Sequence, residues 1–175
     1  DLGGFYLDII KDRQYTLQAD SHARRSAQSA MHHVAEAFVR WIAPILSFTA
    51  DEMWGFIAGE REANVCVSQW YALPQAANRN ISDDEWAIVQ QAREAINKTI
   101  EHQRKEGVIG AGLEAEVKLY CSPTIKAALS KLQNELRFVT ITSTAELFDL
   151  DETAGQASIL PGLRIDVVKS DSNKC

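Results

Sequence analysis

Residues 21–45 read SHARRSAQSAMHHVAEAFVRWIAPI, and this stretch carries the strongest periodic signal in the chain. Its apolar residues recur at alternating steps of four and three, at Ala27, Met31, Val34, Phe38, Trp41 and Ile45. These steps match the 3.6-residue period of an amphipathic α-helix. Asp20 or Ser21 can cap the start of this helix. Pro44 should kink or end it, because proline has no N–H and its ring clashes with the preceding turn.

A second apolar face lies immediately upstream, in residues 2–17. Its members again recur at three- and four-residue steps and predict a helix; they are Leu2, Phe5, Tyr6, Ile9 and Ile10. A charged cluster, Lys11-Asp12-Arg13, follows them, and Tyr15 lies one turn beyond Lys11.

Two capping boxes predict the next helices. Thr49 with Glu52 should begin a short helix that stops at Gly59, and Ser82 with Glu85 should begin a longer one that ends near Gly107. The segment between them, 60–81, contains proline and asparagine and is predicted to be mostly connection, with a short extended piece at 65–67.

The period changes to two after residue 107. Alternating apolar residues predict strands at 115–119 and 163–167, and the β-branched run 138–142 predicts another. Ser122-Pro123 should begin a helix whose apolar stripe is Ile125, Leu129, Leu132 and Leu136. We therefore predict a mainly α protein, with a helical region at 1–107 followed by a small α+β unit at 108–175.

Composition excludes several classes of protein. No apolar run approaches the roughly 20 residues of a membrane span, and three widely spaced cysteines do not make a disulfide framework. The net charge is −6, but residues 1–48 hold five basic and five acidic side chains, so the remainder holds 13 basic and 19 acidic and carries the deficit. If the protein binds RNA, the first 48 residues are the favoured place.

The sequence contains no recognisable active site. It has no phosphate-binding loop and no nucleophile elbow. His32 and His33 are neighbours, so on a helix they point about 100° apart and do not form a metal-binding pair. Among the tryptophans, Trp41 and Trp86 are predicted to lie in the core and Trp54 to be half-buried, while the pair Trp70-Tyr71 has no explanation.

Six residues are candidates for RNA contact: Lys11, Asp12, Arg13, Tyr15, Arg24 and Arg25. Lysine and arginine neutralise phosphates, aspartate can accept from a base amino group, and tyrosine can stack on an unstacked loop base. The alternative for the same residues is a solvated helix face with local ion pairs.

Two stretches resemble the anticodon-binding region of isoleucyl-tRNA synthetases. One is FYLDIIKDRQY at 5–15, and the other is RWIAPILSFTADEMW at 40–54, a version of which the valyl and leucyl enzymes share. The resemblance extends to 93–100, 109–110, 113–115, 119–120 and 135–139. It implies a partial helical anticodon-binding bundle that recognises isoleucine-specific tRNA, without the class I catalytic domain. Of the six candidates, Lys11, Asp12 and Arg13 are on matching positions.

The resemblance also carries expectations about the parent enzyme. It would be a cytoplasmic, monomeric ligase that attaches isoleucine to its tRNA with ATP and Mg²⁺. A Lys-Cys pair opens a zinc-binding tail in bacterial members, and here Lys174-Cys175 ends the sequence, so one cysteine cannot make the site. Without the upstream helices, part of the Leu2 or Phe38 face should be exposed and should favour self-association.

Three alternatives remain open. The first is a valyl- or leucyl-tRNA synthetase in place of the isoleucyl enzyme. The second is a helical protein-interaction module without an RNA role, which the acidic net charge favours. The third, an independent metal-dependent enzyme that uses His32 or His33, has the least support.

Overall fold

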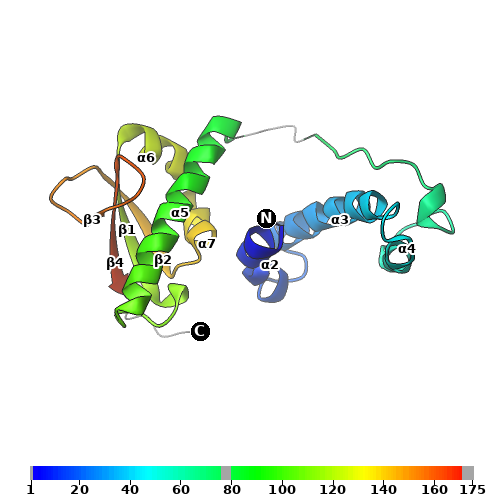
Figure 1. The fold of residues 1–175 in the computed structure, drawn as a ribbon, viewed down its shortest axis with the longest axis horizontal. Helices are drawn as coiled ribbons and strands as arrows, with labels where there is room; N and C mark the ends of the chain where they lie inside the picture. Colours follow the sequence, from blue (N-terminus) through cyan, green and yellow to red (C-terminus); the bar gives the residue numbers. More distant parts are fainter. Residues whose placement is uncertain (1, 76–79, 171–175) are drawn as a thin grey trace. The chain divides into compact units, whose positions relative to one another are not determined.

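A computed structural model describes residues 2–75 and 80–170. The chain forms two compact units, Asp1–Ala77 and Asn78–Cys175, which Figure 1 shows as a helical part and a part that contains a sheet. The helical content followed by a small sheet confirms the predicted fold class.

The first helical segment is less regular than predicted. It consists of a π-helix at Leu2–Tyr6, α1 at Leu7–Ile9 and α2 at Lys11–Tyr15. Ile10 is its buried residue and stands at the junction between α1 and α2. Thr16 ends the segment by donating its hydroxyl to the Asp12 carbonyl at 2.6 Å. The predicted helix is therefore present over most of 2–17, but as short pieces.

The long helix α3 spans His22–Ile42 and agrees with the prediction at both ends. The Ser21 hydroxyl accepts the Arg24 N–H at its start, and the helix stops two residues before Pro44. Its fully buried residues are Ala27, Glu36, Ala37 and Val39.

The larger apolar residues of α3 lie mostly in solvent. Trp41 is 53% exposed, so its prediction as a core residue was wrong; Met31, Phe38 and Ile45 are exposed as well. The neighbours of α3 in its unit include α2, α4 and the Val65–Val67 turn. The buried apolar side chains of α3, those of Ala27, Ala37 and Val39, are small. The exposed apolar face predicted for this region is confirmed.

The helix α4 spans Ser47–Phe56 and begins two residues before the predicted Thr49. The Ser47 hydroxyl donates to the carbonyl of Ala43 at 2.9 Å. Thr49 therefore lies inside the helix, and the capping box predicted there was wrong. Trp54, 2% exposed, is more buried than predicted and forms a core cluster with Val39, Ala43, Ala50 and Val65.

The segment at Val65–Val67 is a 3₁₀ turn, not the predicted extended piece. The Asn64 side chain accepts the Cys66 N–H at 2.7 Å, and the Asp51 carboxylate accepts the Val65 N–H at 3.2 Å. These side chains satisfy backbone donors locally and favour a turn over a strand.

The second unit begins with α5, Asp83–Lys105, whose Ser82/Glu85 capping box forms as predicted. Its buried residues are Val89, Ala92, Ala95, Ile96 and Ile100. They pack against the helices and the sheet of this unit, so α5 belongs to it. The compact units therefore divide near residue 77 and not at the predicted 107.

The sheet has the strand order β2-β1-β4-β3. Its central strand, β1 at Ala115–Cys121, pairs in parallel with β2 at Thr144–Asp149 and antiparallel with β4 at Leu163–Lys169. The short β3, Gln156–Ala157, pairs with the edge of β4. Alternate residues of β1 are buried. The strands predicted around 115–119 and 163–167 are confirmed.

The region between β1 and β2 differs from the prediction. α6 spans Pro123–Ser130, and the stripe predicted to continue through Leu132 and Leu136 stops with it. After the short 3₁₀ turn Gln133–Glu135, residues 136–140 form α7, Leu136–Thr140, so the strand predicted at 138–142 was wrong. Leu136, Val139 and Thr140 are buried, and this tertiary packing overrides the β-propensity of the segment.

Candidate nucleic-acid interface

The six candidate residues lie on two consecutive helices, α2 and α3, close to the turn that connects them. Lys11, Asp12, Arg13 and Tyr15 belong to α2, and Arg24 and Arg25 belong to the first turn of α3. The two helices pack against each other, and residues 16–21 form the connection between them. We call these six residues the corner cluster.

The α2 side of the corner cluster presents both charge and an aromatic ring to solvent. The Lys11 ammonium lies 2.7 Å from the Asp8 carboxylate. This hydrogen bond and the nearby negative charge raise the pKa of Lys11, so the lysine is cationic at neutral pH. Tyr15 is 84% exposed, and Asp12 is also exposed.

The arginines of the corner cluster differ in their surroundings. Arg13 is half-buried and lies near Tyr6. Burial raises the pKa of Tyr6, and the positive charge of Arg13 partly opposes that rise. Arg24 is also half-buried and donates to the Leu17 carbonyl at 2.8 Å, so it braces the turn before α3. Arg25 is exposed.

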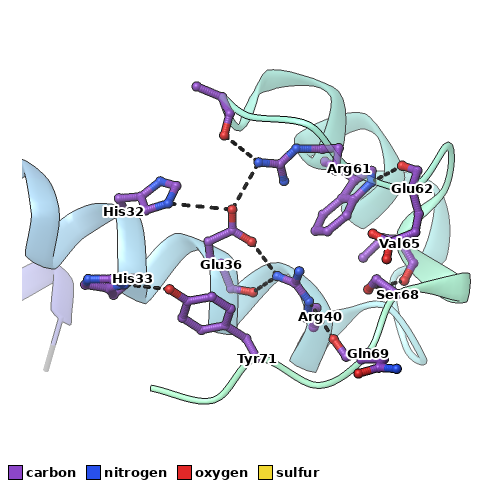
Figure 2. A network of polar contacts seen from close by, with 12 residues as sticks. His32, His33, Glu36, Arg40, Arg61, Glu62, Val65, Ser68, Gln69 and Tyr71 are labelled. Carbon is purple, nitrogen blue, oxygen red and sulfur yellow. Dashed lines mark hydrogen bonds and ion pairs between the residues drawn. The ribbon is translucent and has the colours of Figure 1, made fainter. Parts of the chain in front are cut away.

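A buried ionic network at the other end of α3 was missed in the sequence. Glu36 is buried, and its carboxylate accepts hydrogen bonds from Arg40, at 2.5 Å, and from Arg61, at 3.0 Å. Figure 2 shows the carboxylate at the centre of these contacts. Both guanidinium groups also lie over the ring of Trp54, each 4.5 Å from its centroid. The i, i+4 spacing of Glu36 and Arg40 was visible in the sequence, but Arg61 comes from a distant segment.

Residues 58–71, which we call the strap, are tied to α3 through this network. Arg40 donates its Nε–H to the carbonyl of Gln69 at 2.8 Å, and Arg61 itself belongs to the strap. Further along, the Tyr71 hydroxyl lies 2.6 Å from Nδ1 of His33 (Figure 2). Burial by itself raises the pKa of Glu36, but the hydrogen bonds and charges of the two arginines outweigh it and lower this pKa overall.

The histidines do not form a metal site in the described part of the chain. His33 is engaged with Tyr71, and His32 lies 3.8 Å from the Glu36 carboxylate. Within residues 2–75 and 80–170, no group of three or more histidine, cysteine, aspartate or glutamate side chains could hold a metal ion. The cysteines Cys66 and Cys121 do not cluster there, and Lys174-Cys175, singled out for zinc, lies outside the described residues. The residues described do not fit a zinc site.

No helix among the described residues has the length and the apolar character that crossing a membrane requires.

A family model described as the anticodon-binding domain of tRNA ligase matches residues 1–119. The chain therefore belongs to the family of tRNA-ligase anticodon-binding domains. Over its whole length it is similar to curated isoleucine–tRNA ligases: 51% identical to those of Saccharophagus degradans and Pseudomonas aeruginosa, and 47% identical to that of Cronobacter sakazakii. It spans 19% of the length of each of these relatives.

These findings confirm the resemblance seen in the sequence, including the choice of the isoleucine enzymes. Family membership implies tRNA as a partner and disfavours the protein-interaction alternative.

Proposed function

We propose that this chain grips the anticodon stem-loop of isoleucine tRNA through the corner cluster. The observation that carries the proposal is an exposed tyrosine on the same short helix as Lys11 and Arg13, in a chain of an anticodon-binding family. Packing of the first unit does not require Tyr15 to lie in solvent, whereas an unstacked loop base offers it a stacking partner.

Each member of the corner cluster has a separate role in this proposal. Lys11 and Arg25 neutralise phosphates, because both are exposed. Arg13 and Asp12 reach base edges, where a guanidinium donates and a carboxylate accepts. Arg24 holds the turn in place through the Leu17 carbonyl and acts on RNA indirectly.

The whole protein is proposed to be an isoleucine–tRNA ligase, as the names of its relatives suggest. It would use ATP and Mg²⁺ to attach isoleucine to tRNA, in the cytoplasm and as a monomer, with the chemistry in a part of the polypeptide outside these 175 residues. Zinc is proposed for the whole protein on the resemblance alone, with Lys174-Cys175 at the start of the zinc-binding segment.

The isolated chain is proposed to self-associate through its exposed apolar residues. The largest are on α3, α4 and their connection: Phe38, Trp41, Ile45, Phe48 and Phe56. Exposed apolar surface of this kind favours association in water. Sedimentation velocity over a hundredfold concentration range should show an oligomer that grows with concentration, and a monomer throughout would refute this part of the proposal.

A titration of fluorescently labelled anticodon stem-loop tests the RNA-binding proposal. Lys11→Ala and Arg25→Ala should each weaken binding. Each should also reduce the magnitude of the slope of log affinity against log salt concentration by about one, the value for one lost phosphate contact. Lys98→Ala is the matched control, because Lys98 is an exposed lysine of the second unit in an ion pair with Glu94. Equal affinities for all variants across the salt series would refute the proposed role of the corner cluster in RNA binding.

Binding to stem-loops of isoleucine, valine and leucine tRNAs tests specificity. Preference for the isoleucine stem-loop is expected, and Asp12→Asn and Arg13→Lys should reduce that preference more than they reduce overall affinity. Equal binding of the three RNAs would contradict the isoleucine assignment but not RNA binding itself.

A further inference from the structure

Trp70 is an exposed aromatic residue whose position the packing of the first unit does not explain. Its side chain is 70% exposed, although burial of an indole is among the larger apolar contributions to stability. It belongs to the strap, and it lies next to Tyr71, whose ring is stacked on His33 with 6.0 Å between centroids. Tyr71 is thus anchored on α3, whereas its sequence neighbour Trp70 is exposed to solvent.

The backbone on both sides of Trp70 is fixed to α3. On one side Arg40 binds the Gln69 carbonyl at 2.8 Å, and on the other the Tyr71 hydroxyl meets His33 at 2.6 Å. One residue earlier, the Ser68 hydroxyl donates to the Val65 carbonyl at 2.7 Å. The indole is therefore held in solvent by a rigid support, which is the arrangement that a binding platform needs, because little ordering entropy remains to be lost.

A shallow pocket of about 320 Å³ adjoins the indole. Pro44 and Ala43 contribute apolar surface to it, and Ser47, Ser68 and Gln69 contribute polar groups. Arg40 is the charged residue of the lining, and no acidic side chain belongs to it. A flat ring with polar edges fits such a lining better than a purely apolar side chain does.

Arg40 is the cation that the pocket lining itself presents. Behind the lining, the Glu36 carboxylate faces the guanidinium groups of Arg40 and Arg61, and the Asp51 carboxylate accepts the N–H of Val65. A guanidinium in the wall of a pocket with mixed polarity can attract a phosphodiester next to a bound base.

We propose that Trp70 is a stacking platform for an unstacked base of the bound RNA, with the pocket at Arg40 receiving the edge of that base. This inference rests on the proposed function, which supplies the RNA. It adds a second contact at the opposite end of α3. Arg24 and Arg40 are 16 residues apart on that helix, or about 24 Å at 1.5 Å per residue. One RNA would thus lie along α3 and touch the corner cluster and Trp70 together.

The experiment measures binding of isoleucine tRNA, as a full transcript, to the 175-residue chain and to four variants, Trp70→Ala, Trp70→Phe, Phe56→Ala and Lys11→Ala. Trp70→Ala should weaken binding roughly tenfold, since base–aromatic stacking accounts for about 5- to 150-fold per base. Trp70→Phe should restore most of that loss. Phe56→Ala is the matched control, because Phe56 is also an exposed aromatic residue of the same unit and lies outside the pocket lining.

A spectroscopic readout separates stacking from a general loss of affinity. 2-Aminopurine is placed at each unpaired position of the tRNA in turn, and emission is recorded at saturating protein. One position should be quenched by the wild-type chain and by Trp70→Phe, and should recover with Trp70→Ala. A structural role of Trp70 would not produce quenching at a single position.

The outcomes distinguish this inference from the proposed function. If Lys11→Ala weakens binding and Trp70→Ala does not, the platform is refuted and the corner cluster stands. If Trp70→Ala weakens binding and Lys11→Ala does not, the platform is supported and the corner cluster is refuted. If Phe56→Ala weakens binding as much as Trp70→Ala, the exposed aromatic surface acts through protein association and the platform is refuted. A wild-type chain that binds no tRNA overturns both.

Discussion

Replacing Glu36 by alanine should destabilise the first unit more than any other single substitution of a charged residue in it. The carboxylate is 8% exposed and accepts hydrogen bonds from Arg40 and Arg61, whose side chains are 14% exposed. Without it, two neighbouring guanidinium groups lose their counter-charge while they stay largely desolvated. The strap also loses one of its ties to α3.

The magnitude follows from that burial. Removing one partner of a buried ion pair costs about 3–5 kcal/mol. Both arginines keep other contacts here, with the Gln69 and Ala58 carbonyls and the Trp54 ring, so we expect the lower end, about 3 kcal/mol. Glu36→Gln keeps the hydrogen-bond acceptor but not the charge, and should cost about half as much. For a unit of this size m is about 1 kcal/mol/M, so the alanine variant should lower the urea midpoint by about 3 M.

The assay is urea unfolding followed by tryptophan fluorescence in a Trp86→Phe background. The other tryptophans, Trp41, Trp54 and Trp70, all lie in the first unit, so the signal reports that unit alone. Asp8→Ala is the control, because Asp8 forms an exposed ion pair with Lys11, and it should leave the midpoint unchanged. A Glu36→Ala midpoint within about 0.5 M of the wild type, which is roughly the resolution of the method, would refute the argument that the network stabilises the unit.

Four further outcomes are expected. The lowered pKa of Glu36 means that the first unit loses stability as the pH falls from about 4.3 through the folded-state pKa, and acid titration of Glu36→Gln should lack this loss. Burial raises the pKa of the Cys121 thiol to about 11, so mass-spectrometric mapping after alkylation at pH 8 should find Cys66 modified in the native protein and Cys121 only after unfolding. In thermal melts, Gly55→Ala in α4, with open space around it, should stabilise the first unit by about 0.5–1 kcal/mol. By contrast, Gly155→Ala should destabilise the second unit, because Gly155 has φ of +59° and an added Cβ would lie 2.9 Å from the Ile165 backbone.

Local signals located most of the helices. These signals are Ser21 before α3, Pro44 after it, and the Ser82/Glu85 capping box at the start of α5. Each acts within a few residues, so its effect can be predicted from the sequence. The corner cluster was likewise visible as a run of residue types, and its exposure at Tyr15 agrees with a surface role.

Local signals failed where distant packing was stronger. The β-branched residues at 138–142 favour a strand, but buried contacts of Leu136 and Val139 hold the segment as α7. Trp41 lies on a regular apolar stripe, yet Val39 and Ile42 are the apolar residues of α3 in or against the core cluster with Trp54, and Trp41 itself is 53% exposed. Periodicity shows that a face is apolar and does not show what covers it.

The sequence by itself determined where α3 and α5 begin and end, that a sheet follows them, and which family the chain resembles, because capping, periodicity and short motifs are local properties. Only the tertiary structure decided that α5 joins the second unit, that Glu36 gathers Arg40 and Arg61, and that Trp70 stands in solvent beside a pocket. Those features depend on segments far apart in the chain, and their contact energies appear only once the chain has folded.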